Sequence, residues 1–126
     1  MRNKVTNKAG FTLVEIMIVV AIIGLLAAIA IPNFVRARTT SQMNACINNL
    51  RQIDGAKQQW ALETKQATNA TPVYTDISGY MKNSVICPAG GTGATFGSTY
   101  NILDVSQKPT CQIVPTTHVL PPDTSN

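Results

Sequence analysis

The feature that most constrains this chain is an apolar run close to its start. Residues 11–31 read FTLVEIMIVVAIIGLLAAIAI, and only Thr12, Glu15 and Gly24 among these 21 residues are not strongly apolar. As an α-helix, the run is about 31 Å long, which matches the roughly 30 Å hydrocarbon core of a bilayer. The sequence therefore predicts a helix that spans a membrane once.

Basic residues lie just before this run and predict its orientation. Arg2, Lys4 and Lys8 are three of the chain's 10 lysines and arginines. Because such residues stay on the cytoplasmic side, we expect a cytoplasmic N-terminus and an exported C-terminal part. Residues 11–126 carry 7 basic minus 6 acidic residues, or +1. No basic run of five or more follows the tip, so nucleic acid is not an expected partner.

The composition also disfavours an enzyme. His118 is the one histidine of 126 residues, which leaves little material for acid/base catalysis, although carboxylate or cysteine chemistry is not excluded by counting. We expect no enzyme and no cofactor.

Two simple explanations of the apolar run leave Glu15 unexplained. A removable secretory signal has a similar basic tip and apolar run, and Ala28-Ile29-Ala30 fits its cleavage site. A plain uncleaved membrane anchor is the other explanation. A carboxylate inside an apolar span costs about 2.5 to 3.5 kcal/mol on insertion scales, so Glu15 needs a partner or a task. Neither explanation supplies one.

The residues around Glu15 carry a family resemblance. The sequence KAGFTLVE at residues 8–15, followed by the apolar run, resembles the class III signal of type IV pilins and of type II secretion pseudopilins. The likeness covers residues 4 to about 40 and extends weakly through residues 45–53 and 87–91, which resemble short bacterial pilin-like proteins. In that family a prepilin peptidase cuts between the residues that match Gly10 and Phe11, and it methylates the new amine.

The resemblance implies a function and a set of partners. We expect a structural subunit that polymerises through its N-terminal helix into a pilus or a shorter pseudopilus, with an assembly platform, an ATPase and membrane lipid as further partners. Glu15 is expected to neutralise the Phe11 amine of a neighbouring subunit during assembly. Snorkelling of Glu15 to the interface is the competing explanation. Other candidate functions are an anchored binding protein or enzyme and a DNA-uptake pilin.

Spacing predicts the organisation of the exported part. Pro32 should kink a helix that continues to residue 65. We therefore divide the chain into a leader (1–10), an assembly helix (11–31), an amphipathic helix (32–65) and a β-region (66–126). The amphipathic helix has an apolar stripe at three- and four-residue steps, and other faces carry polar residues that include Lys57. The stripe consists of Ile47, Leu50, Ile53, Ala56 and Trp60.

Composition changes after residue 64, where six of the seven prolines and five of the eight glycines lie. Candidate strands are residues 84–87, 98–105 and 110–114, the last two forming a hairpin, and residues 77–81 suggest one helical turn. The predicted class is α+β, pilin-like, with the long helix packed on a three- or four-stranded antiparallel sheet.

Three cysteines suit a small exported head that needs a covalent staple. Cys87 and Cys111 lie in candidate strands and suggest a disulfide, and Cys46 is expected to be a buried free thiol, with either pairing of Cys46 as the alternative. A zinc site with His118 is not expected, because separations of 41, 24 and 7 residues match no compact ligand spacing. The aspartates that could gather around calcium form no D-x-D cluster, so no metal site is expected; they are Asp76, Asp104 and Asp123.

Overall fold

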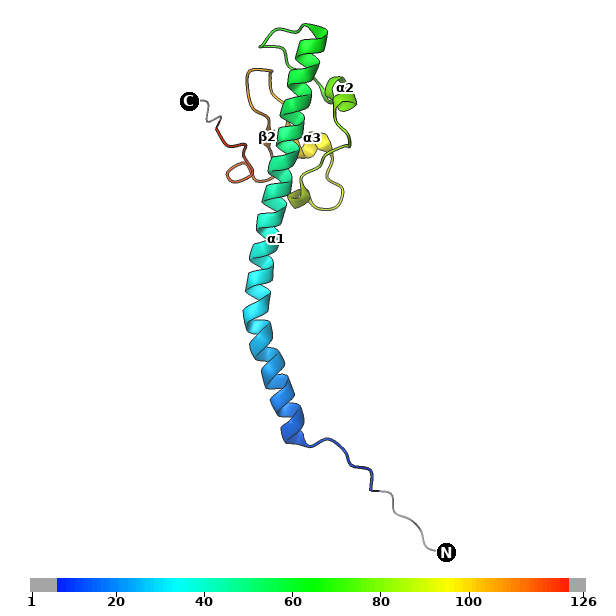
Figure 1. The fold of residues 1–126 in the computed structure, drawn as a ribbon, viewed down its shortest axis with the longest axis vertical. Helices are drawn as coiled ribbons and strands as arrows, with labels where there is room; N and C mark the ends of the chain where they lie inside the picture. Colours follow the sequence, from blue (N-terminus) through cyan, green and yellow to red (C-terminus); the bar gives the residue numbers. More distant parts are fainter. Residues whose placement is uncertain (1–6, 123–126) are drawn as a thin grey trace, which may run out of the picture. The chain divides into compact units, whose positions relative to one another are not determined.

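The computed structural model describes residues 7–122, which lie in two compact units, Met1–Ala37 and Arg38–Asn126. The first unit holds the N-terminal segment and the start of the long helix α1 (Leu13–Thr64). The second unit, which we call the head, holds the rest of α1 and all the other elements (Figure 1). Arg2, Lys4 and Asp123 lie outside the described residues.

The helix α1 contains Pro32 and ends at Thr64. The predicted kink at Pro32 stays a prediction, because the helix assignment is continuous there. At the other end, Lys65 adopts a left-handed conformation with φ of 54°, and the amide of Gln66 donates to the carbonyl of Ala61 at 2.9 Å. This six-to-one hydrogen bond is a Schellman cap, which satisfies a carbonyl that the end of a helix leaves unpaired.

The predicted apolar stripe of α1 forms one side of the head's core. Leu50, Ile53 and Ala56 are buried, and Ile47 and Trp60 are partly buried. One assignment was wrong, because Lys57 is fully buried rather than on a solvent face. Its ammonium donates to the carbonyls of Ile102 and Gln107, and these hydrogen bonds offset the cost of burying the charge.

The other elements of the head are short. They are α2 (Tyr74–Ile77), α3 (Phe96–Thr99), the 3-10 turns η1 (Ser78–Tyr80) and η2 (Pro88–Gly90), and the strands β1 (Tyr100–Asn101) and β2 (Thr110–Cys111). The two strands pair antiparallel, with Tyr100 opposite Cys111 and Asn101 opposite Thr110. The α+β class and the hairpin are confirmed, and a helical turn is found close to its predicted place. Within the described residues the sheet has two strands rather than three or four.

The missing strands have local causes. In the candidate strand 84–87 the carbonyl of Ile86 accepts from the side chain of Asn49 on α1. In the candidate strand 98–105, residues 98–99 belong to α3, and Leu103 has a φ of 59°, which ends the extended chain. The amide of Val105 then donates to the carbonyl of Ala70 in a loop. Hydrogen bonds to side chains and loops thus replace those of a wider sheet.

Apolar residues from almost every element of the head meet in one core. Ile77 from α2, Met81 and Val85 pack with the stripe of α1. Aromatic rings extend the cluster: the rings of Tyr74 and Phe96 have centroids 4.5 Å apart. The core positions Cys46, Cys87 and Cys111 side by side, and all three are buried.

Candidate functional site

The predicted cleavage site lies immediately before α1. Gly10 and Phe11 are not helical, and the helix begins at Leu13. Thr12 and Glu15 form a reciprocal pair there: the amide of Thr12 donates to Glu15 Oε2 at 2.7 Å, and the amide of Glu15 donates to Thr12 Oγ1 at 3.2 Å. This arrangement is a capping box, which satisfies free amides at the start of a helix.

The capping box is a role of Glu15 that the sequence reasoning missed. Its signal was available, because Thr12-Leu13-Val14-Glu15 has the T-x-x-E spacing directly before an apolar run. The side chain therefore has a partner within its own chain. This local partner does not test whether Glu15 also meets the Phe11 amine of a neighbour, which stays a prediction.

The first part of α1, which includes Glu15, is mostly apolar and exposed. We call residues 13–31 the apolar half of α1. Its large side chains are more than half exposed at most positions, such as Leu13 at 84% and Leu25 at 66%. By length and composition α1 can cross a membrane, and its most apolar stretch has a mean hydropathy of 2.9, with no part of it buried by the described residues. Exposed apolar area of this extent needs lipid or other helices to cover it.

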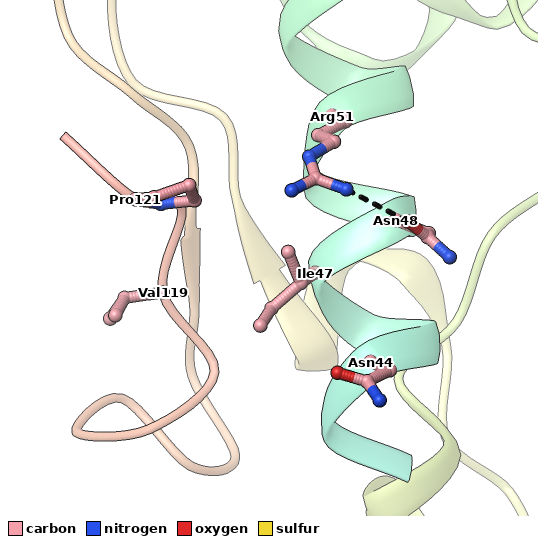
Figure 2. A pocket seen from close by; sticks show the side chains of 6 residues that line it. All are labelled: Asn44, Ile47, Asn48, Arg51, Val119 and Pro121. Carbon is pink, nitrogen blue, oxygen red and sulfur yellow. Dashed lines mark hydrogen bonds between the residues drawn. The ribbon is translucent and has the colours of Figure 1, made fainter. Parts of the chain in front are cut away.

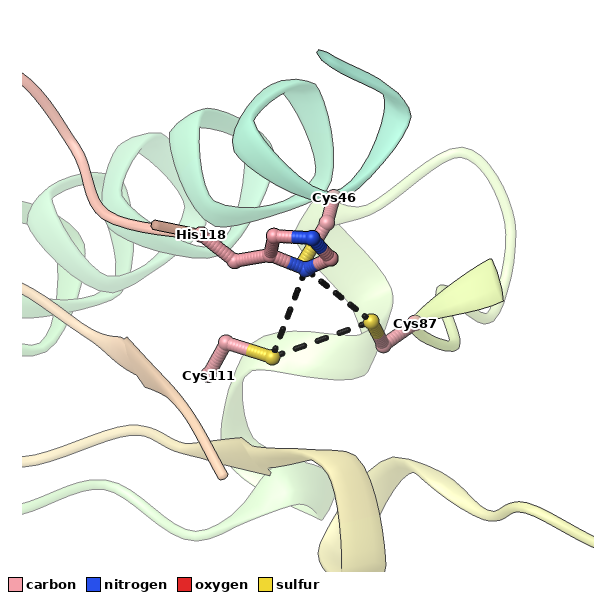
Figure 3. Close-up of side chains that lie close together, drawn as sticks. All are labelled: Cys46, Cys87, Cys111 and His118. Carbon is pink, nitrogen blue, oxygen red and sulfur yellow. Dashed lines mark hydrogen bonds between the residues drawn. The ribbon is translucent and has the colours of Figure 1, made fainter. Parts of the chain in front are cut away.

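A second group of chemically capable side chains lies in the core of the head. Cys46 from α1, Cys87 just before η2, Cys111 from β2 and His118 from the C-terminal loop are all buried. We call these four residues the Cys3His cluster. In Figure 3 their sulfur atoms and the His118 ring face one another, and one ligand atom from each lies within 4.8 Å of the others.

Distances within the Cys3His cluster are short. The Sγ atoms of Cys87 and Cys111 are 3.7 Å apart. Nδ1 of His118 lies 3.6 Å from the sulfur of Cys87 and 3.9 Å from that of Cys111. The fold therefore brings the four residues together, and the spacing argument against a shared site fails, because loops and not a compact motif create the juxtaposition. The Cys87–Cys111 disulfide stays a prediction.

Polar groups around the Cys3His cluster hold it in place. The hydroxyl of Tyr100 lies 3.5 Å from the sulfur of Cys46, and the side-chain amide of Asn49 donates to this hydroxyl at 3.0 Å. Burial raises the pKa of the Cys46 and Cys87 thiols, and a hydrogen bond from the backbone amide of Ala89 opposes that rise at Cys87. Burial lowers the pKa of His118, which favours the neutral imidazole.

The described aspartates of the calcium hypothesis each cap a local turn. Asp76 accepts from the amide of Val73 at the start of α2, and Asp104 accepts from the amides of Ser106 and Gln107. Asp123 lies outside the described residues. The two described carboxylates thus serve the backbone beside them, and their hydrogen bonds explain their positions.

An open pocket of about 520 Å³ lies between α1 and the C-terminal segment of the head (Figure 2). Its lining combines amide, guanidinium and aliphatic groups from Asn44, Ile47, Asn48, Arg51, Val119 and Pro121. The guanidinium of Arg51 donates to the side-chain oxygen of Asn48 at 3.2 Å. The lining residues include no carboxylate, thiol or imidazole, so this pocket carries none of the groups that acid/base or nucleophilic catalysis commonly uses.

Comparison with known proteins identifies relatives along most of the chain. The family model "Prokaryotic N-terminal methylation motif" matches residues 5–31. Competence protein ComGC of Bacillus subtilis is 34% identical over 86 residues, which are 67% of this chain and 85% of ComGC. Fimbrial protein EcpC of Eikenella corrodens is 36% identical over 101 residues, 78% of this chain and 66% of EcpC. No solved structure matches the chain significantly.

A stronger but shorter match is the type IV major pilin protein PilA of Myxococcus xanthus, 50% identical over 54 residues. Those residues are 43% of this chain and 24% of PilA, so the chain spans a quarter to two thirds of the length of PilA and EcpC. The methylation motif, the exposed apolar half of α1 and the matches to fimbrial proteins agree with one another. The chain belongs to the type IV pilin family.

Proposed function

We propose that the chain is the precursor of a filament subunit. It is cut after Gly10, methylated at Phe11 and polymerised through the apolar half of α1 into a type IV pilus or a related pseudopilus. Before assembly it lies in the inner membrane with the head exported. Its role is structural rather than enzymatic, and a prepilin peptidase, an assembly platform and an ATPase act on it.

The exposure of the apolar half of α1 is the observation that carries this proposal. The apolar side chains there have no cover among residues 7–122, whereas those of the head have a core of their own. A bilayer covers such a helix in the precursor, and helices of other subunits cover it in a filament. The apolar half of α1 thus holds the precursor in the membrane and later contacts other subunits in the filament.

Glu15 adds a preference for one register between neighbouring helices. Cleavage after Gly10 converts the nitrogen of Phe11 into an amine that is predominantly cationic below a pKa of about 8. The capping box keeps the Glu15 carboxylate at the start of α1, beside the new terminus. In a low-dielectric bundle a neighbour whose axial stagger joins the amine to this carboxylate is favoured over one that leaves both charges alone.

Mass spectrometry of the membrane-extracted chain tests the processing. We expect an N-terminus at Phe11 with one added methyl group, and the matched variant Gly10→Val should accumulate uncut. A chain that starts at Ile31 would instead identify residues 1–30 as a secretory signal. Sheared surface fractions from the same cells should contain the processed chain in filaments.

A DNA-uptake filament is a second candidate, favoured by the match to competence protein ComGC, of which the chain covers 85%. The charge of residues 36–126 is 7 basic minus 5 acidic, or +2, which gives the head little electrostatic attraction for DNA. Purified filaments that bind duplex DNA, and release it steeply as salt rises, would favour this candidate. Salt-independent or absent binding would leave the pilus or pseudopilus.

A further inference from the structure

We propose that the Cys3His cluster binds one Zn²⁺ ion that holds the head together. The inference is independent of the filament proposal, because it concerns only side chains in the core of the head. Thiolate and imidazole are the ligands that zinc prefers in structural sites, and Cys3His is one of the common ligand sets. Three sulfur ligands favour a soft or borderline metal over magnesium or calcium.

The distances in the cluster match a tetrahedral zinc site. With Zn–S bonds of about 2.3 Å and a Zn–N bond of about 2.05 Å, tetrahedral geometry separates two sulfurs by about 3.8 Å and a sulfur from the nitrogen by about 3.6 Å. The sulfurs of Cys87 and Cys111 are 3.7 Å apart. Nδ1 of His118 lies 3.6 Å and 3.9 Å from these two sulfurs. Three of the four ligand atoms thus already have the spacing of a tetrahedral site, and the sulfur of Cys46 lies within 4.8 Å of each of them.

The surrounding hydrogen bonds suit bound thiolates. Three thiolates and one Zn²⁺ carry a net charge of −1, which buried donors must stabilise. The Tyr100 hydroxyl lies at hydrogen-bond distance from the sulfur of Cys46, and because Asn49 donates to the hydroxyl oxygen, its proton is free to point at that sulfur. The amide of Gly90 donates to the carbonyl of Cys87 at 2.9 Å, which fixes the backbone beside that sulfur. Such donors around metal ligands orient them and tune metal affinity.

The architecture of the head gives the ion a task. The four ligands come from α1, the segment before η2, strand β2 and the C-terminal loop, so one ion joins four parts of the chain. The elements after α1 have four residues or fewer each. A small domain with so little regular structure commonly needs a metal or disulfides for stability. Four buried protein ligands leave no open coordination position, which is typical of a structural and not a catalytic zinc site.

A disulfide between Cys87 and Cys111 is the competing use of the same atoms. It would consume two thiols and leave Cys46 and the buried His118 imidazole with no common role. Zinc engages all four groups, each through a proton-free ligand atom, and the three thiols release their protons to solvent on binding. The two states are exclusive, because a disulfide sulfur is no longer a thiolate.

Metal analysis of the full-length chain, purified in detergent from membranes, tests the proposal. We expect about one zinc ion per chain. Replacement of zinc by Co²⁺ should give sulfur-to-cobalt charge transfer in the near ultraviolet and the intense visible bands of a tetrahedral site. His118→Ala should lower the metal content and weaken these bands.

Two variants separate metal binding from folding. His118→Cys keeps four ligands, so it should retain about one ion per chain, with the cobalt bands shifted toward those of an all-sulfur site. Tyr100→Phe removes only the hydroxyl beside Cys46, and it should keep the tetrahedral spectrum while zinc affinity falls roughly 10-fold or more.

Metal-free protein would overturn the proposal in either of two forms. Non-reducing peptide mapping that links Cys87 to Cys111 would assign the disulfide. Three thiols that stay reduced in a folded, metal-free head that also fails to take up added Zn²⁺ or Co²⁺ would assign an ordinary apolar core. Unchanged zinc content and unchanged cobalt bands in His118→Ala would also count against the ligand role of position 118.

Discussion

Each half of α1 carries a charge among apolar side chains, and the two charges are satisfied over very different distances in the sequence. Glu15 in the apolar half hydrogen-bonds to Thr12, three residues away. Lys57 in the head donates to the carbonyls of Ile102 and Gln107, 45 and 50 residues away, and lies 3.7 Å from Asp54. Glu15 keeps its local partner whatever surrounds the helix, whereas Lys57 needs the folded head.

This difference separates the apolar half of α1, a surface that other molecules can cover, from the core of the head, which the chain itself covers. The apolar half of α1 is helical throughout and its start is capped within the same segment, so lipid and neighbouring helices can exchange around it. From Cys46 onward, by contrast, one face of α1 is buried in the core of the head. We therefore expect changes at Glu15 to affect assembly and changes at Lys57 to affect folding.

The largest expected effect follows from Glu15→Gln. Glutamine at this position can still accept from and donate to Thr12 in the capping box, but it removes the negative charge. We expect a processed, methylated and folded chain with few or no filaments in sheared fractions, because the Phe11 amine then lacks a counter-charge and an unpaired buried charge costs about 3 to 5 kcal/mol.

Glu15→Ala serves as the comparison, since it removes the charge and the capping box together. If Glu15→Gln assembles at the wild-type yield while Glu15→Ala fails, the capping box is the important role and the charge pair is wrong. If both variants form normal filaments, Glu15 is better explained as a residue that the peptidase recognises, or as one whose side chain snorkels to the membrane interface.

The next effect concerns Lys57→Met, which keeps an unbranched side chain but leaves two buried carbonyls without their donor. We expect the free energy of unfolding of the head to fall by about 1 to 3 kcal/mol. Trp60, the one tryptophan of the chain, packs against the core and reports unfolding by its fluorescence. The exposed Lys82→Met is the matched control and should change stability by less than about 0.5 kcal/mol.

The protonation of Lys57 gives a smaller, pH-dependent effect. Burial lowers the pKa of Lys57, and the charges of Asp54 and Asp104 only partly oppose this. The unfolded chain then binds more protons than the folded one between the lowered pKa and about 10.4, so the Lys57 contribution to stability rises with pH through that window. The stability difference between wild type and Lys57→Met should widen from pH 7 to pH 10. A constant difference would contradict the lowered pKa.

The smallest expected effect is a gain at Gly55, which is exposed in the middle of α1 and has no atom within 4 Å of an added Cβ. Gly55→Ala should stabilise the head by about 0.5 to 1 kcal/mol in denaturant unfolding. Gly90→Ala is the contrasting variant, because its Cβ would lie 2.9 Å from Cβ of Ala94, and it should destabilise the head. If Gly55→Ala instead destabilises the head, another subunit must pack closely against the backbone at this position.

Sequence reasoning succeeded where the determining residues are contiguous. The motif at residues 8–15 and the apolar run are read without knowledge of the fold, and the stripe at Leu50, Ile53 and Ala56 follows from helical periodicity. The reasoning failed where distant segments decide. Nothing local marks Lys57 as buried, since the two carbonyls to which its ammonium donates belong to residues 45 and 50 positions later.

The strands and the cysteines illustrate the same limit. Residues 84–87 have the composition of a strand, but the carbonyl of Ile86 accepts a hydrogen bond from the side-chain amide of Asn49 on α1 instead of from another strand. Cys46, Cys87, Cys111 and His118 have no motif spacing, because irregular loops with left-handed residues such as Leu103 bring their segments together. Such turns depend on backbone conformations that composition alone does not specify.

The capping box also has a consequence for the bond that the proposed processing breaks. Peptide chains that are recognised along their backbone bind in an extended form, and a bond inside a helix must first unwind to be reached. Because Thr12 and Glu15 fix the first helical residue at Leu13, the peptide bond between Gly10 and Phe11 stays outside the helix. A peptidase that cuts between Gly10 and Phe11 would therefore break no helical hydrogen bond to reach this peptide bond.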